Sequence, residues 1–267
     1  MHKVTSRDGT PIAVESRGEG PALVYVGGAF NDRNSGAPLA ELLAGSCTVH
    51  CYDRRGRGDS GDTQPYAVGR EIEDLAAVIA ESGGSAFVYG MSSGCALALE
   101  AAVRGVPIDG LVLFEPPYNP AGVGELMRES KEYATKLTAL LAERRNGDAA
   151  ELFMRTVGLP PEMIAQMRGG PMWAHLEALA PTLAYDSAVM CDSEGGCLPV
   201  ERVSKITAPT LVLSGGASPE WMRTVAQQVA DTVQNGRHQV LEGQTHDVDP
   251  RAVAPAVREF VRRHAGR

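Results

Sequence analysis

The chain has 267 residues, a formal net charge of −8 and 43% hydrophobic residues, so it is long enough to fold around one large core. Its acidic charge argues against nucleic acid or an anionic membrane surface as a partner, because neither would attract it electrostatically. No apolar run approaches the roughly 20 residues that span a bilayer, and the amino terminus lacks the apolar centre of a signal peptide. We therefore expect a cytoplasmic protein.

Short β-branched runs alternate with helical patterns, which predicts an α/β fold with a mostly parallel, doubly wound sheet of about eight strands. The sheet is expected to open with a hairpin that turns at Asp8-Gly9. We expect strands at residues 4–7, 12–16, 22–26, 48–52, 111–114, 210–213 and 238–241, and in the apolar run that starts at Ala86. We expect helices at residues 35–44, 72–79, 95–103, 221–230 and 250–264.

Strand signals are absent from about Tyr118 to Val200, where glycines and prolines interrupt helical patterns. We therefore predict a core domain of residues 1–117 and 201–267, with residues 118–200 inserted as a helical cap or lid. Six of the nine methionines fall in this segment, where flexible thioethers could line an adaptable apolar pocket or simply pack the helices together. Some residues of this segment must face the reacting groups of the core, and few charges are available for that role, so we expect a neutral, moderately apolar substrate.

A serine lies at the tip of a predicted strand–turn–helix, in the pattern Gly90-x-Ser92-x-Gly94. Only small residues at the two flanking positions let the backbone turn so sharply, because a Cβ there would collide with a neighbouring strand or helix. The turn lifts the Ser92 hydroxyl out of the sheet and sets backbone N–H groups of the helix beside it. This geometry is typical of a nucleophile that attacks a carbonyl carbon.

The order of elements, this serine turn and the sequence Gly-Gln-Thr-His246 after the last predicted strand resemble the α/β-hydrolase superfamily. The likeness covers nearly the whole chain, and it includes Gly27-Gly28 after the third strand and the loop 53–60 after the fourth. It implies a serine-nucleophile hydrolase with a catalytic triad, an oxyanion hole and a lid. It implies no cofactor.

Histidine suits the task of taking the serine proton, because its pKa lies near neutrality. Of the six histidines, two lie near the termini, two lie within predicted strands, and His175 lies in the predicted lid. His246 lies in a loop just beyond the carboxyl end of a strand, where α/β sheets place their chemistry. We therefore predict that His246 is the catalytic base.

The third triad member departs from the superfamily pattern, which usually has an aspartate after the seventh strand. The aligned residue is Ser218, which cannot supply the negative charge that stabilises a histidinium. Glu115, at the end of the sixth strand, and Glu220 are the two candidates. The sequence Ser218-Pro219-Glu220 also reads as a helix N-cap followed by a first turn, which explains Glu220 without catalysis. We favour Glu115, because some superfamily members carry this acid at the end of the sixth strand and because a carboxylate at a buried strand end needs a partner.

Two backbone N–H groups are expected to bind the oxyanion that develops during acyl transfer. Ser93 offers one at the start of the helix, and alignment with the superfamily assigns the second to Ala29.

Two further features are expected to be structural. The loop 53–60 contains Arg54, Arg55 and Arg57 among aspartates, and such alternating charges usually pair with each other or with water rather than binding a phosphate. Cys47, Cys51 and Cys95 are expected to be buried thiols, whereas a disulfide or a metal site at Cys191 and Cys197 stays open, with the metal disfavoured because no histidine lies near them at ligand spacing.

Together these residues predict a serine hydrolase that cleaves a carboxylic ester, a lactone or a thioester through an acyl-enzyme. The alternative is another member of the same fold: a natural-product tailoring enzyme, a lyase, a carbon–carbon bond hydrolase or a ligand-binding receptor. The missing aspartate keeps this alternative open. We expect a monomer or homodimer that acts on a small molecule.

Overall fold

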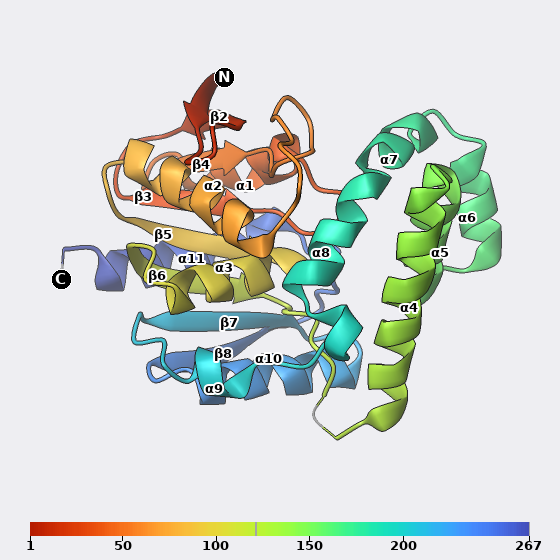
Figure 1. The fold of residues 1–267 in the computed structure, drawn as a ribbon. Helices are drawn as coiled ribbons and strands as arrows, with labels where there is room; N and C mark the ends of the chain where they lie inside the picture. The colour runs from red at the N-terminus through yellow and green to blue at the C-terminus, as the bar shows by residue number, and fades with distance from the viewer. Residues whose placement is uncertain (121, 267) are drawn as a thin grey trace.

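A computed structural model describes residues 1–120 and 122–266 as an eight-stranded sheet with helices packed around it (Figure 1). The strand order is β1-β2-β4-β3-β5-β6-β7-β8, and only the β1–β2 and β2–β4 pairs are antiparallel. The strands are β1 (His2–Thr5), β2 (Pro11–Arg17), β3 (Ala22–Val26), β4 (Thr48–Tyr52), β5 (Ala86–Met91), β6 (Ile108–Phe114), β7 (Thr210–Gly215) and β8 (Gly236–Leu241). The predicted mostly parallel sheet of about eight strands is confirmed.

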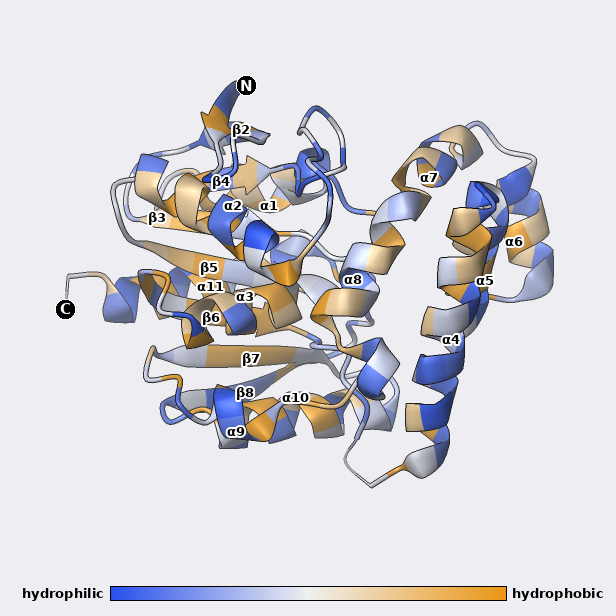
Figure 2. Cartoon of the chain, in the orientation of Figure 1, coloured by the Kyte–Doolittle hydropathy of each residue, from blue (hydrophilic) through white to orange (hydrophobic). Residues whose placement is uncertain are grey.

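Helices cover both faces of the sheet because its inner strands are apolar on both sides (Figure 2). In β3, for example, Val24 and Val26 pack into one core cluster while Leu23 and Tyr25 pack into the other. The first cluster includes residues of α2 (Val68–Glu81), α3 (Ser93–Val103) and α10 (Glu220–Thr232), and the second includes residues of α1 (Ala37–Leu43) and α11 (Pro250–His264). Near-continuous apolar runs are typical of parallel strands that are buried in this way.

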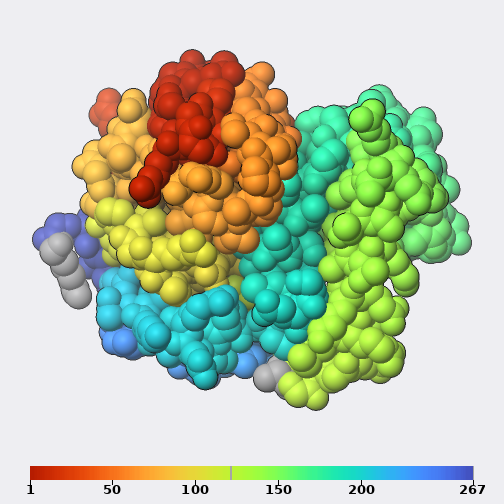
Figure 3. All heavy atoms as spheres, viewed as in Figure 1, coloured from red at the N-terminus to blue at the C-terminus, as the bar shows by residue number. Residues whose placement is uncertain are grey.

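The chain between β6 and β7 is helical throughout its described elements, and we call residues 118–200 the helical insertion. Its helices are α4 (Gly124–Ala142), α5 (Asn146–Thr156), α6 (Pro161–Arg168), α7 (Trp173–Leu179) and α8 (Leu183–Val189), and the short α9 (Val200–Val203) follows. The insertion stands against one side of the core (Figure 3). Helix α8 lies between the two parts, because it contacts α2 and α3 of the core as well as α4.

The insertion has an apolar cluster of its own, built mainly from α4 and α5, with Tyr133, Leu137 and Trp173 among its buried members. Of its methionines, Met154 and Met190 are buried, whereas Met163 and Met172 are more than half exposed. Packing therefore accounts for two of the methionines that could have lined a pocket, and two others face solvent.

No helix in the described residues combines the length and the apolar character that crossing a bilayer would require.

Candidate active site

Ser92 occupies the sharp turn between β5 and α3, where its backbone takes the left-handed φ of 55°. The turn is fixed by its neighbours, because the Ser92 N–H donates to the carbonyl of Phe114 at 3.0 Å. Both flanking glycines are required: a Cβ on Gly94 would lie 2.2 Å from the Val26 carbonyl oxygen, and one on Gly90 would lie 2.9 Å from the Cα of Cys95. The structure therefore confirms the predicted need for small residues two positions before and after Ser92.

Glu115 follows β6 directly, and its side chain is fully buried. Its backbone also has a left-handed φ, of 50°, and its N–H donates to the Leu213 carbonyl at 3.0 Å. The carboxylate accepts two hydrogen bonds, from the Gly215 N–H at 2.8 Å and from His246 Nδ1 at 2.7 Å. Burial by itself raises the pKa of Glu115, but the hydrogen bonds outweigh it and lower the pKa below its usual value.

His246 lies in the loop after β8, and its side chain is 40% exposed. Its ring centroid is 6.4 Å from that of Phe114, the residue whose carbonyl fixes the serine turn. Because an ionised carboxylate can only accept a hydrogen bond, Nδ1 is the donor to Glu115, and in a neutral imidazole Nε2 is then the acceptor. The ring is therefore oriented and held in the tautomer that a general base needs.

Glu220, the other candidate acid, does not take part in the hydrogen bond between Glu115 and His246. Glu220 is exposed in the first turn of α10, whereas Glu115 makes the hydrogen bond to the histidine. The predicted N-cap at Ser218 is wrong by one residue, because Pro219 occupies that position. Ser218 is instead buried, and its hydroxyl is among the groups that lower the pKa of Glu115.

The loop after β3 is pressed against the serine. A Cβ on Gly28 would lie 2.8 Å from the Ser92 Cβ, so only glycine permits this approach. Ala29 and Phe30, which follow, pack against the apolar cluster of the insertion, and the Phe30 ring meets that of Phe153 edge-on at 5.3 Å. Phe30 also has a left-handed φ, of 58°.

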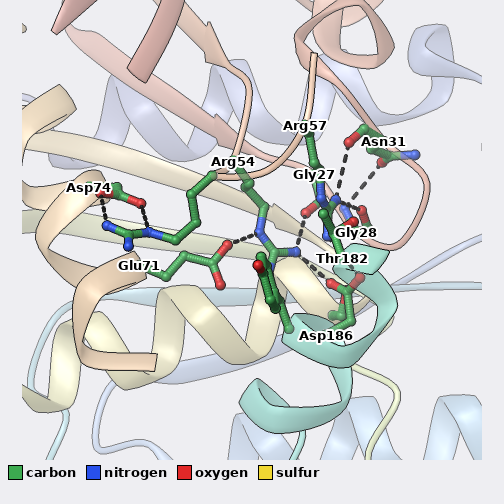
Figure 4. Close-up of polar contacts among 12 residues, drawn as sticks. Gly27, Gly28, Asn31, Arg54, Arg57, Glu71, Asp74, Thr182 and Asp186 are labelled. Atoms are coloured by element: carbon green, nitrogen blue, oxygen red, sulfur yellow. Dashed lines mark hydrogen bonds and ion pairs between the residues drawn. The ribbon is translucent and has the colours of Figure 1, made fainter. Parts of the chain in front are cut away.

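Two arginines of the loop 53–60 donate to carbonyls of the loop after β3 and belong to a buried group that we call the arginine cluster, consisting of Arg54, Arg57, Glu71 and Asp186 (Figure 4). Asp186 of helix α8 accepts from Arg54 Nη1 at 2.6 Å and from Arg57 Nη2 at 2.8 Å. Burial alone raises the pKa of Asp186, but Arg57 and Arg54 outweigh it and keep the carboxylate ionised, with a lowered pKa.

The expected structural role of these arginines agrees with their burial, but the expected partners were wrong. Arg54 and Arg57 pair with acids from α2 and α8, and Arg55 pairs with Asp74 and Asp8, not with the aspartates of their own loop.

Asp186 is the residue near the site that the sequence analysis missed. Besides the two arginines, it accepts a hydrogen bond from the Ser93 hydroxyl at 2.7 Å. One charge of the insertion therefore lies beside the serine turn, where two arginines compensate it. The sequence does contain a signal for it. Asp186 is the one acid in the mostly apolar segment 183–189, and a charged side chain that is buried with such a segment needs a partner.

All five cysteines are free thiols, so the disulfide considered between Cys191 and Cys197 is absent. Within residues 1–120 and 122–266, no cluster of three or more histidine, cysteine or acidic side chains could hold a metal ion.

Comparisons with known proteins match this architecture. Residues 23–256 match a family model described as the alpha/beta hydrolase family. A solved alpha/beta hydrolase from Sphaerobacter thermophilus is 55% identical, with a TM-score of 0.87 over 97% of this chain and 99% of that chain. A thermophilic esterase from Thermogutta terrifontis has the same fold, with a TM-score of 0.73 and 24% identity over 98% of both chains.

One curated relative, the uncharacterized hydrolase YraK of Bacillus subtilis, is 32% identical over 100 residues. That match covers 36% of this chain and only 37% of the relative.

The lowered pKa of Glu115 predicts an acid-dependent loss of stability. An unfolded glutamate has the usual pKa of 4.5, so the ionised side chain stabilises the fold above that pH, and the contribution disappears as pH falls through the lower folded value. The variant Glu115→Gln lacks this titration. The difference in free energy of unfolding between wild type and variant, from urea denaturation, should therefore be largest near pH 7 and shrink below about pH 4.5. A difference that stays constant or grows on acidification would contradict this assignment.

Proposed function

Because the chain belongs to the alpha/beta hydrolase family, we propose that it is a serine hydrolase that cleaves a carboxylic ester, a lactone or a thioester. The observation that carries the proposal is the 2.7 Å hydrogen bond from His246 Nδ1 to a fully buried carboxylate that follows the strand next to the serine turn. In this mechanism Ser92 attacks the acyl carbon while His246 takes its proton, and Glu115 stabilises the histidinium. His246 then protonates the leaving group, and water activated by the same imidazole releases the acyl-enzyme.

The oxyanion of each tetrahedral intermediate is proposed to accept from the backbone N–H groups of Ala29 and Ser93. Ser93 begins α3, so its N–H belongs to the unsatisfied donors at a helix N-terminus. The Ala29 position is supported by the contact between Gly28 and Ser92. Donors of this kind are already oriented before charge develops, and losing one typically costs about 3 kcal/mol of transition-state stabilisation.

The substrate is proposed to be a neutral, moderately apolar small molecule, with the helical insertion acting as the lid above it. The support is the apolar cluster of the insertion, which packs against Ala29 and Phe30 beside the serine turn. The edge-on pair of Phe30 and Phe153 joins the core loop to the insertion, and Tyr133 lies 6.5 Å from Phe153 between ring centroids. An apolar acyl group could replace water against such aromatic surfaces with a favourable free energy.

A fluorophosphonate should label the wild-type protein stoichiometrically, because the activated serine attacks phosphorus as it attacks an acyl carbon. Labelling should be lost in Ser92→Ala, and intact-mass and peptide mass spectrometry should map the adduct to Ser92. The variant Ser193→Ala, which alters an exposed serine of the insertion, serves as the control and should be labelled like wild type. An inert wild type would favour a non-hydrolytic or binding role, and labelling that persists in Ser92→Ala would refute the assigned nucleophile.

The two candidate acids should differ sharply in their effect on turnover. We expect Glu115→Gln to lower kcat for a short-chain p-nitrophenyl ester by about 10³-fold or more, because the histidinium loses its buried counter-charge. Glu220→Gln should change kcat by less than about threefold, as is usual for an exposed residue away from the reaction. Steady-state kinetics of both purified variants make the comparison, and the reverse order would transfer the role to Glu220.

A further inference from the structure

The carbonyl of Gly28 and the N–H of Ala29 belong to one peptide group. A trans peptide is planar, with its C=O and N–H pointing in opposite directions. Any interaction that fixes the Gly28 oxygen therefore also fixes the direction of the Ala29 N–H. That oxygen accepts from Arg57 Nη1 at 2.5 Å and from the Asn31 N–H at 3.2 Å.

Arg57 cannot easily move away from this peptide, because its guanidinium is fully buried and held on two sides. Nη1 also donates to the Asn31 carbonyl at 3.1 Å, and Nη2 donates to Asp186 at 2.8 Å (Figure 4). Arg54 repeats the pattern one residue earlier, since its Nη1 bridges Asp186 and the Gly27 carbonyl at 3.1 Å. One carboxylate from the insertion thus orients two arginines that hold successive carbonyls of the loop.

The second N–H group is tied to the same carboxylate. The Ser93 hydroxyl donates to Asp186 Oδ1 at 2.7 Å, and the Ser93 N–H shares its peptide with the Ser92 carbonyl, which accepts from the Cys95 N–H at 2.8 Å. Asp186 therefore contacts the residue that bears one N–H and the arginine that fixes the other. These hydrogen bonds connect the Gly28 carbonyl to Ser93 through Arg57 and Asp186.

We propose that Arg57 and Asp186 are positioning residues for the oxyanion hole. Arg57 orients and polarises the Ala29 N–H through the Gly28 carbonyl, and Asp186 holds Arg57 and Ser93 in place through hydrogen bonds. The inference rests on the proposed function and extends it, because it makes the oxyanion hole depend on a carboxylate of the helical insertion. A cationic donor on the Gly28 oxygen also strengthens the Ala29 N–H as a donor, since hydrogen bonds through one peptide polarise each other.

Arg55, a matched arginine in the same loop, serves as the control that distinguishes a positioning role of Arg57 from a purely structural one. Arg55 is equally buried and paired, with Asp74 at 2.7 Å and Asp8 at 3.1 Å. Among the described residues, its side chain donates to one backbone carbonyl, that of Arg70 in α2, and to no carbonyl of the loop after β3. Disturbing Arg55 should therefore affect stability without affecting the N–H groups.

The test compares wild type, Arg57→Lys, Asp186→Asn and the control Arg55→Lys on a short-chain p-nitrophenyl ester. We expect Arg57→Lys and Asp186→Asn to lower kcat about 10- to 100-fold with KM within about threefold, because a misdirected donor weakens binding of the developed charge more than of the substrate. Inhibition by a trifluoromethyl ketone, which forms a tetrahedral adduct with the serine, should weaken by a similar factor. Arg55→Lys should keep kcat within about twofold even where its Tm falls.

The proposal would be overturned if Arg57→Lys and Asp186→Asn kept wild-type kcat, or if Arg55→Lys lost as much kcat as they do. Asp186→Asn preserves the side-chain shape, so it tests the idea if Arg57→Lys does not fold, and failure of both to fold would also count against it. An inert wild type would refute the proposed function itself, whereas an active wild type with unaffected variants would refute only this inference.

Discussion

Backbone strain at the carboxyl edge of the sheet is the constraint on which the candidate site depends. Phe30, Ser92 and Glu115, which follow β3, β5 and β6, all have φ between 50° and 58°, and each such conformation costs on the order of 1–3 kcal/mol. The strain persists because the parallel sheet over-determines these positions. The N–H groups of Ser92 and Glu115 are bound by carbonyls of the neighbouring strands, at Phe114 and Leu213. The sheet therefore supplies the stability that keeps a serine and a carboxylate in conformations they would not adopt alone.

Two buried carboxylates, Glu115 and Asp186, accompany this strain. Glu115 is stabilised by the groups that hydrogen-bond to it, while Asp186 is stabilised by two guanidinium groups, so neither carboxylate is buried without compensation. Replacing such pairs by apolar residues is often neutral, but removing one partner leaves an uncompensated charge and costs about 3–5 kcal/mol. Breaking the contacts of Asp186 would therefore disturb both the docking of α8 and the loop at Gly27 and Gly28. Docking of the insertion and the geometry of the site are physically linked.

The sequence predicted those parts of the molecule that depend on local patterns. Alternation of strand and helix signals predicted the sheet, and the glycines around Ser92 predicted the turn, because both follow from backbone sterics within a few residues. The departure from the usual aspartate led to Glu115 on two grounds: the resemblance, because some superfamily members carry this acid at the end of the sixth strand, and the need of a carboxylate at a buried strand end for a partner. The observed partner is His246, 131 residues away in the chain.

What the sequence could not predict depended on contacts between distant segments. Asp186 lies 129 residues from Arg57, and no local pattern shows that α8 docks against the loop of the arginines. Ser218 was interpreted as an N-cap because its neighbours have that composition, yet tertiary contacts bury it near Glu115. In both cases the deciding interaction is electrostatic and long-range in sequence.

The most direct test of the central claim is a crystal structure of the protein after reaction with a small fluorophosphonate. The account predicts phosphorus bonded to Ser92 Oγ, His246 Nε2 within hydrogen-bonding distance of that oxygen, and one phosphonyl oxygen about 3 Å from the backbone nitrogens of both Ala29 and Ser93. A phosphonyl oxygen directed to solvent, or an imidazole out of contact with the adduct, would contradict it.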